Sequence, residues 1–361
     1  MFGLKKLDLY IIRKFLGTFF FTMLLIIFIV IIFDFSERID DFIERQAPFR
    51  EIVFDYYLNF IPFFVNLFSP LFLFITVIFF TARLAQNTEI VAILSSGISF
   101  NRMLLPYIIP ALIIGVMSSG LANFVIPPAN RIRLEFESKY FRAPETFWGR
   151  NIHLQINPGE FVFMESYNQP TATGFRFTLE KIEEGRLVYK MNAETARWDS
   201  ITGVWSLLNY NIRQISGIEE TLTFGAKRDT ILPFSPNDFI QNLRKIETLG
   251  FTELHNFIDR LRRKGAENVE FYQVEMYQRL LFPASALILT LIGVSLSNRK
   301  VRGGIGLHLG LGLGLSFAYI LFMQVTTTFA TKGNLHPMIA VWIPNIFFGI
   351  IGYALYRLSP K

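Results

Sequence analysis

The stretch TARLAQNTEIVAILSSGISFNRMLLP, residues 81–106, separates two long apolar runs and decides how the fold is interpreted. A tight turn needs only a few residues, yet this link is about twenty residues long and has a helical rhythm. Four apolar side chains share one side of a helix placed over residues 87–96, namely Ile90, Val91, Ile93 and Leu94. The link therefore predicts a short surface helix between two membrane spans.

Both ends of this helix carry signals in the sequence. Asn87 or Thr88 can cap the N-terminus, Glu89 puts a negative charge in the first turn, and Gly97 follows as a stop. Two interpretations remain open. The helix either seals the bundle at the membrane surface or docks a partner, with Glu89 as a cap or an ion-pair group.

The composition is that of a membrane protein. Of 361 residues, 52% are hydrophobic and only 18% are charged, whereas soluble domains average about 25% charged residues. The net charge of +6 is modest, and the basic residues adjoin apolar runs, so membrane orientation explains them better than nucleic acid binding. The absence of cysteine excludes disulfides, thiolate nucleophiles and cysteine-ligated metals.

Six apolar segments are long enough to cross a bilayer as helices, which takes roughly 20 residues. They cover residues 10–33, 54–80, 103–126, 280–296, 304–329 and 338–356. The first is too long for the apolar core of a signal peptide and lacks a cleavage site, so we expect a retained helix. Prolines inside the second and third spans predict kinks whose freed carbonyls are satisfied by neighbouring helices.

Basic residues orient these spans. With the N-terminus in the cytoplasm, the cytoplasmic ends carry Lys5, Lys6, Arg13, Lys14, Arg83, Arg102, Arg299, Lys300, Arg302, Arg357 and Lys361. The short outer loops carry only Arg38, Arg45, Arg50 and Lys332. We therefore expect both termini and residues 81–106 in the cytoplasm, and residues 127–279 outside.

The outer region predicts a separate β domain over residues 127–250. Between residues 151 and 232, six short runs with alternating faces are broken by turn residues, which is typical of an antiparallel sandwich or open barrel. Such a domain suits an interaction module and needs no ligand. An amphipathic helix and a connection follow over residues 251–279, with Gly265 as the helix stop. Residues 1–126 and 280–361 supply the six membrane helices.

The fifth span begins with GGIGLHLGLGLGLSFAYI, residues 303–320. One helical face repeats a small residue every four positions, at Gly306, Gly310, Gly314 and Ala318. The neighbouring face has Gly304, His308, Gly312 and Ser316. Small residues at this spacing let helices approach closely in lipid, so this helix belongs to an interface. That interface is either static or one that slides and separates.

Motifs for chemistry are missing from the sequence. There is no phosphate-binding loop of the G-x-x-x-x-G-K-[ST] type, and the four histidines have no metal-ligand spacing. The spans also lack the inward acidic residues of proton- or sodium-coupled transporters. We therefore expect no enzyme site, no metal site and no cofactor in this chain.

The pattern R-L-x-x-x-x-E-I-x-A-I-L-S-S-G-I-S, residues 83–99, resembles the cytoplasmic coupling helix of the lipopolysaccharide export permeases, the YjgP/YjgQ family that includes LptF and LptG. Three other stretches are similar to that family. They are residues 198–209 with two tryptophans, the trio Glu275, Arg279 and Pro283, and His336-Pro337 followed by WIPN at 342–345. The order of three helices, a β domain and three helices also agrees.

The resemblance implies a membrane α-helical fold with an inserted extracytoplasmic all-β jellyroll-like domain, in the bacterial inner membrane. It implies a second permease subunit of the same family, as a hetero- or homodimer, over a cytoplasmic ABC ATPase dimer that binds ATP and Mg. Lipopolysaccharide would enter between the subunits and pass to periplasmic jellyroll bridge proteins, which join the β domain by strand addition.

The resemblance also assigns roles to residues. The ATPase-coupling residues would be Arg83, Glu89, Ile90, Ile93, Leu94 and Gly97. The lateral gate would be Gly306, Gly310, Gly314 and Ala318. Relatives carry basic residues near the outer end of the first helix, but residues 34–45 here read DFSERIDDFIER. Phosphate contacts are therefore assigned to Arg38, Arg133 and Arg279, with partner residues, divalent cations or a less phosphorylated lipid as alternatives.

Two other functions remain open. The chain is either an ABC-type permease for another envelope lipid or lipoprotein, or a non-transporting membrane scaffold that displays a β domain.

Overall fold

The computed structural model describes residues 5–141, 148–217, 219–236, 243–263, 269–301 and 303–359. The chain divides into two units. The helical unit comprises Met1–Phe141, Thr248–Phe251 and Glu270–Lys361, and the β unit comprises Arg142–Glu247 and Thr252–Val269. Of the basic residues counted for orientation, Arg302 and Lys361 lie outside the described residues.

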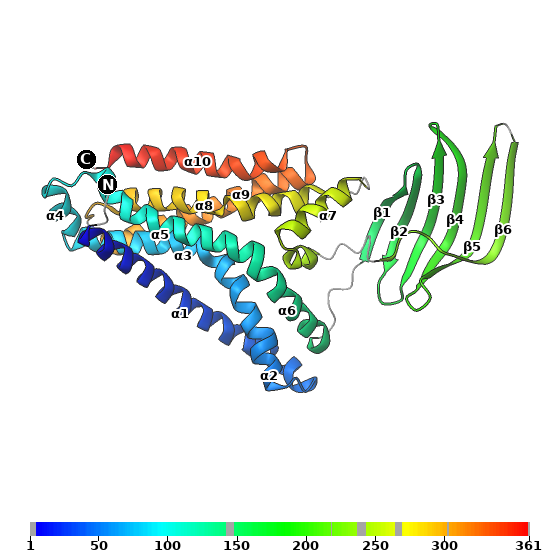
Figure 1. Ribbon diagram of the computed structural model, residues 1–361, viewed down its shortest axis with the longest axis horizontal. Helices are drawn as coiled ribbons and strands as arrows, with labels where there is room; N and C mark the ends of the chain where they lie inside the picture. Colours follow the sequence, from blue (N-terminus) through cyan, green and yellow to red (C-terminus); the bar gives the residue numbers. More distant parts are fainter. Residues whose placement is uncertain are drawn as a thin grey trace. The chain divides into compact units, whose positions relative to one another are not determined.

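The helical unit consists mainly of long helices (Figure 1). They are α1 (Lys6–Glu44), α2 (Phe49–Glu51), α3 (Leu58–Gln86), α4 (Glu89–Ser95), α5 (Phe100–Gly120), α6 (Ile126–Tyr140), α8 (Val269–Ser297), α9 (Gly304–Lys332) and α10 (Pro337–Leu358). Two π-helical turns, η1 (Ile52–Tyr57) and η2 (Leu121–Val125), connect α2 to α3 and α5 to α6.

Six helices in the described part of the chain are long and apolar enough to cross a membrane. They run over Lys6–Glu44, Phe49–Gln86, Phe100–Tyr140, Val269–Ser297, Gly304–Lys332 and Pro337–Leu358. Each of the six predicted spans lies within one of these helices, so the sequence prediction of their number and order is confirmed.

The third membrane helix is longer than expected. Residue 127 was the expected start of the β domain, but the helix continues through η2 and α6 to Tyr140, and the first strand begins at Trp148. Pro127 lies in the first turn of α6, directly after the π-helical turn η2, and the helix continues through it.

A continuous apolar core fills the helical unit, with α3 at its centre. This helix packs against α1, α5 and α9, and Phe74 and Ile78 are fully buried. The backbones of α5 and α8 approach so closely that a Cβ atom on Gly115 would lie 2.7 Å from the Cα atom of Pro283. Only a glycine permits this contact.

Pro283 also shows how a kinked membrane helix is satisfied by its neighbour. Proline has no N–H to donate to the carbonyl of Arg279, four residues earlier. Ser119 Oγ on α5 donates a hydrogen bond to that carbonyl at 2.7 Å. The compensation expected for the second and third spans is thus present at the fourth.

A small polar cluster joins three helices inside the core. Ser285 Oγ on α8 donates to Asn345 Oδ1 on α10 at 2.8 Å, and Tyr319 OH on α9 contacts Ser285 Oγ at 3.0 Å and Asn345 Oδ1 at 3.2 Å. Asn345 is completely buried, and its amide nitrogen donates to Val341 O at 2.9 Å. The cluster therefore fixes the register of α8, α9 and α10.

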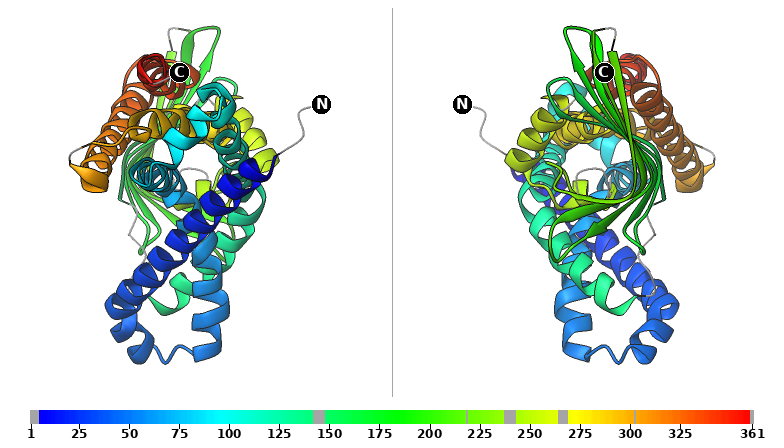
Figure 2. Two further views of the ribbon diagram at one scale, coloured as in Figure 1. Left: turned by 90° about the vertical axis from the view of Figure 1, so that its left-hand side faces the viewer. Right: turned by 90° about the vertical axis from the view of Figure 1, so that its right-hand side faces the viewer.

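The described part of the β unit contains six strands in one curved antiparallel sheet (Figure 2). They are β1 (Trp148–Asn157), β2 (Glu160–Asn168), β3 (Thr173–Glu183), β4 (Arg186–Asp199), β5 (Val204–Ser216) and β6 (Glu219–Thr230). Every strand pairs with its sequence neighbour, so these six strands form a meander without the Greek-key crossovers of a strict jellyroll. The six predicted runs correspond to the six strands, and the fold class of membrane helices with an inserted β domain is confirmed.

The core of the β unit lies along the sheet and centres on Phe177, Trp205 and Leu207, each fully buried. Trp205 Nε1 donates to Phe234 O at 3.0 Å. The unit also holds most of α7 (Phe251–Arg263), whose predicted apolar face is confirmed because Leu254 and Ile258 are buried. Gly265, the expected end of this helix, lies outside the described residues.

Replacing Asn345 tests the three-helix cluster. Asn345→Leu removes the shared acceptor, and we expect a loss of about 1–2 kcal/mol in the free energy of unfolding, measured by SDS titration in mixed micelles. The control is Thr328→Val, which removes an exposed hydroxyl that bonds only within its own helix. Its effect should stay within about 0.5 kcal/mol. Equal effects of the two substitutions would show that the cluster adds no stability.

Candidate functional site

The helix α4 lies at the end of the helical unit where α1 and α5 begin and where α10 ends (Figure 1). It is shorter than predicted, because it begins at Glu89 instead of residue 87. The expected side-chain cap is absent: Thr88 stands in a left-handed conformation, with φ of 60°, and its hydroxyl donates to Asn87 O at 2.6 Å. The expected stop is present, since Gly97 has φ of 86° and its N–H donates to Leu94 O at 3.1 Å.

The two sides of α4 differ from the predicted arrangement in one residue. Ile90 is 1% exposed, and Ile93 and Leu94 pack against the same buried cluster. Val91 is 59% exposed, because one residue turns the helix by about 100° away from Ile90. The exposed side chains Val91, Ala92 and Ser95 form a surface that we call the outer face of α4.

This geometry separates the predicted coupling residues into three groups. Arg83 and Gly97 are exposed, whereas Ile90, Ile93 and Leu94 hold α4 against the core. Glu89 is half-buried and has partners within the chain: Tyr10 OH on α1 donates to Oε2 at 3.1 Å, and Asn87 Nδ2 donates to Oε1 at 3.2 Å. Glu89 therefore ties α4 to the first membrane helix, and its role toward a partner stays a prediction.

A charged pair holds the beginning of α1 in place beside α4. Arg102 at the start of α5 donates from Nη1 to Asp8 Oδ1 at 2.8 Å and also bonds Oδ2. Lys5 N–H donates to Asp8 Oδ2 at 2.7 Å. Such bidentate pairs are strong and directional. The pair and the Tyr10–Glu89 contact together link α1, α4 and α5 at one end.

The two glycine-rich faces of α9 have different surroundings. Gly304 is half-buried, and His308, Gly312 and Ser316 are buried; a Cβ on Gly312 would clash with Ile78 of α3. The four residues of the other face are exposed, namely Gly306, Gly310, Gly314 and Ala318. A Cβ placed on any of the three glycines would meet no atom of the described residues within 4 Å. We call these four residues the open face of α9.

The three arginines expected to bind phosphate each contact other residues of the chain. Arg38 is half-buried and stacks over the Phe141 ring at 4.5 Å. Arg133 is buried, with Nε 3.2 Å from Glu137 Oε1. Arg279 is buried, with Nε 2.9 Å from Glu275 Oε1 and an Nη1 hydrogen bond to Leu249 O at 2.8 Å. Arg133 and Arg279 already have carboxylate partners, so their assignment to phosphate stays a prediction.

Within the described residues, no group of three or more histidine, cysteine or acidic side chains is placed to hold a metal ion. His308 is buried, and its Nε2 atom lies 3.1 Å from the carbonyl oxygen of Arg299. This contact holds the segment that follows α8 against the start of α9.

Sequence reasoning missed the importance of Asp8 and Tyr10. Asp8 stands among basic residues at the start of an apolar helix, where an acidic side chain in the span needs a partner. That signal indicates a paired carboxylate. It does not identify Arg102, which is 94 positions away in the sequence.

Comparison with known proteins gives a family for this chain. Residues 9–358 match the family model of the lipopolysaccharide export system permease LptF/LptG. The chain is 21% identical over 318 residues to the lipopolysaccharide export system permease protein LptG of Escherichia coli strain K12, covering 85% of each chain. The LptG protein of Escherichia coli O6:H1 matches with the same identity and coverage.

The match spans nearly the whole chain and agrees with six membrane helices and an inserted β sheet. Such a protein is a multi-pass inner-membrane permease component of a lipopolysaccharide transport complex with other Lpt proteins, and is not itself catalytic. The chain belongs to the LptF/LptG family of lipopolysaccharide export permeases.

Proposed function

We propose that this chain is the permease subunit of an ABC-type complex that extracts lipopolysaccharide from the inner membrane and passes it to a periplasmic β-jellyroll bridge. The match of residues 9–358 to the export permease family carries this proposal. The α4 end of the helical unit would face the cytoplasm and the β unit the periplasm. The geometry then suggests a task for each exposed surface.

The outer face of α4 would bind a dimer of cytoplasmic ABC ATPases, which supplies ATP and Mg. Its support is the exposure of Val91 beside Ala92 and Ser95, while Ile90 anchors the helix from below. Glu89 and Tyr10 would pass a displacement of α4 to α1. A rigid helix with one anchored side and one exposed side suits a mechanical contact.

The open face of α9 would meet a second permease subunit and form part of a lateral gate. Its support is the row of exposed small residues with free space above each glycine, which lets two helices approach closely without interlocking. The middle of α1 exposes large apolar side chains such as Phe21 (63%) and Phe28 (59%). These two helices would supply the gate in each subunit.

The sheet would bind the periplasmic bridge by strand addition. β1 and β6 each pair with one strand only within the described sheet, so each has a free edge. β6 also exposes Leu222 (55%) and Phe224 (73%). A free edge with apolar side chains is a template for another strand.

A permease for a less phosphorylated envelope lipid is the second candidate. The acidic segment 34–45 favours it. Asp34 accepts hydrogen bonds from Tyr56 OH and Tyr57 OH at 3.1 Å, so this carboxylate serves the contact of α1 with η1. Identification of the lipid that co-purifies with the complex distinguishes the two candidates.

Charge on the outer face of α4 tests ATPase docking. Val91→Glu adds a buried charge at the proposed contact without touching the core, so we expect at least about tenfold less ATPase in the purified complex. The control is Leu358→Glu at the end of α10, a side chain that is 69% exposed at the same end of the unit. If the Val91→Glu complex retains the full amount of ATPase, α4 is not the docking site.

The Tyr10–Glu89 contact predicts a defect that leaves docking intact. Tyr10→Phe removes the hydroxyl that bonds Glu89 Oε2. We expect normal ATPase recovery and a severalfold lower rate of lipid release, because α4 then moves without α1. Glu89→Met, which has no oxygen to accept from Tyr10, should behave in the same way if Glu89 acts within the chain. Loss of the ATPase with Glu89→Met alone would instead place Glu89 in the partner contact.

A larger side chain on the open face of α9 tests whether this face forms the subunit interface. Gly310→Leu finds free space within the chain, so the stability of the isolated subunit should not change. We expect the fraction recovered as a dimer of permease subunits to fall by at least about tenfold, because the helices can no longer approach. Ile320→Phe adds volume on another exposed side of α9 and is the control. Unchanged dimer recovery with Gly310→Leu would exclude this face from the interface.

A further inference from the structure

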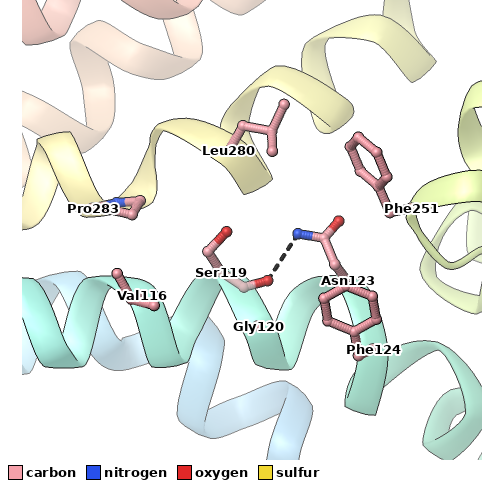
Figure 3. A pocket seen from close by; sticks show the side chains of 8 residues that line it. All are labelled: Val116, Ser119, Gly120, Asn123, Phe124, Phe251, Leu280 and Pro283. Carbon is pink, nitrogen blue, oxygen red and sulfur yellow. Dashed lines mark hydrogen bonds between the residues drawn. The ribbon is translucent and has the colours of Figure 1, made fainter.

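A pocket of about 350 Å³ lies between α5, η2 and α8 in the helical unit (Figure 3). It is lined by Val116, Ser119, Gly120, Asn123, Phe124, Phe251, Leu280 and Pro283. None of these side chains is charged. The volume is at the lower end of the range for small-molecule sites, which suits part of a molecule better than a whole lipid.

The polar groups of Ser119 in this pocket already have partners. Ser119 Oγ donates to Arg279 O at 2.7 Å, and Ser119 O accepts a hydrogen bond from Asn123 Nδ2 at 2.8 Å. Because a carbonyl only accepts, the amide nitrogen of Asn123 must face Ser119. The amide oxygen then points the other way, toward the side of Phe251 (Figure 3).

Asn123 Oδ1 is buried and has no hydrogen-bond partner among the residues that the structure describes. The residue is only 6% exposed, so this oxygen is an acceptor that has lost water without a replacement donor in the described part of the chain. A buried acceptor without a donor is unfavourable. Asn123 also lies within the π-helical turn η2, and such turns occur frequently at functional positions.

The rim of the pocket determines the kind of molecule that can enter. Val116 is 57% exposed, Phe124 74% and Leu280 47%, so the entrance is apolar and belongs to the membrane-spanning surface. The Phe251 side chain, on the side of the oxygen, is 38% exposed. The absence of charged lining residues disfavours a phosphate or carboxylate.

We propose that this pocket binds the alkyl chain of a membrane lipid at the point where the chain carries an amide N–H or a hydroxyl, which donates to Asn123 Oδ1. The chain fills the space above Gly120, and the donor satisfies the buried oxygen. This site is separate from the open face of α9 and does not depend on the proposed export function.

The test compares two photoreactive lipids of equal length. One is a long-chain primary amide with a diazirine on its chain, and the other is the methyl ester of the same acid, which cannot donate a hydrogen bond. The full chain in lipid nanodiscs is irradiated with each, and crosslinks to residues 116–124 and 280–283 are quantified by mass spectrometry. Labelling of the exposed α10 side chains Ile346 and Ile350 normalises the two probes. We expect the amide to label the pocket about fivefold more than the ester, the effect of one hydrogen bond.

Variants assign the preference to individual residues. Asn123→Leu should bring the amide-to-ester ratio to about one, and Gly120→Leu, which fills open space, should suppress both labels. Asn59→Leu is the matched control, because Asn59 Nδ2 likewise bonds backbone carbonyls beside a π-helical turn but lies outside the pocket. A wild-type ratio of one would mean that Asn123 is satisfied by water alone and would overturn the proposal. The same holds if the preference survives in Asn123→Leu.

Discussion

The bidentate contact between Asp8 and Arg102 fixes the start of the first membrane helix against the start of α5. The positions of α1 and α4 depend on this contact. α1 buries a narrow stripe of side chains at intervals of four residues, including Ile11, Phe15 and Phe19. Further along α1, Asp34 accepts hydrogen bonds from the hydroxyls of two tyrosines in η1. This long helix is thus held by two polar contacts and by an apolar stripe between them. Its remaining surface is free for lipid or another subunit.

The same contact also links α4 to the first membrane helix. Because Asp8 fixes the start of α1, Tyr10 is held where it can bond Glu89 on α4. The inner side of α4 is buried in the shared core, and its outer face is exposed. A force applied to this short helix would therefore reach α1 and α5 together. The open face of α9 is on a helix that packs on α3, which in turn packs on α1, so the two proposed contact surfaces share one core.

Periodic patterns made most of the fold predictable. Long apolar runs located all six spans, and alternation between turn residues located all six strands. Which face of each helix is buried was harder to predict from the sequence. The sequence contains two neighbouring rows of small residues in α9, and only packing against Ile78 shows which row is used inside the chain. Val91 was placed with its apolar neighbours because hydrophobicity alone does not tell a buried valine from an exposed one.

Contacts between residues far apart in sequence could not be predicted from one chain. Asp8 and Arg102 each looked like an ordinary charge at a helix end, and Asn123 looked like a polar residue near the end of a span. The sequence prediction did not include the π-helical turn that holds Asn123. The same turn, with Pro127 in the first turn of α6, lets the helix continue to Tyr140 where a break was expected.

The connectivity of the two units has a consequence for the order of folding. In the β sheet every strand pairs with the strand made just before it, and such local pairing forms quickly. The helical unit is closed by segments at opposite ends of the chain, with the whole β unit between them. Gly115 and Ser119 have their partners, Pro283 and the Arg279 carbonyl, only once α8 has been synthesised. During synthesis the first three membrane helices therefore form before their partner helix α8 exists. Until then, Gly115 and Ser119 on α5 are exposed, and they form the surface on which α8 later packs.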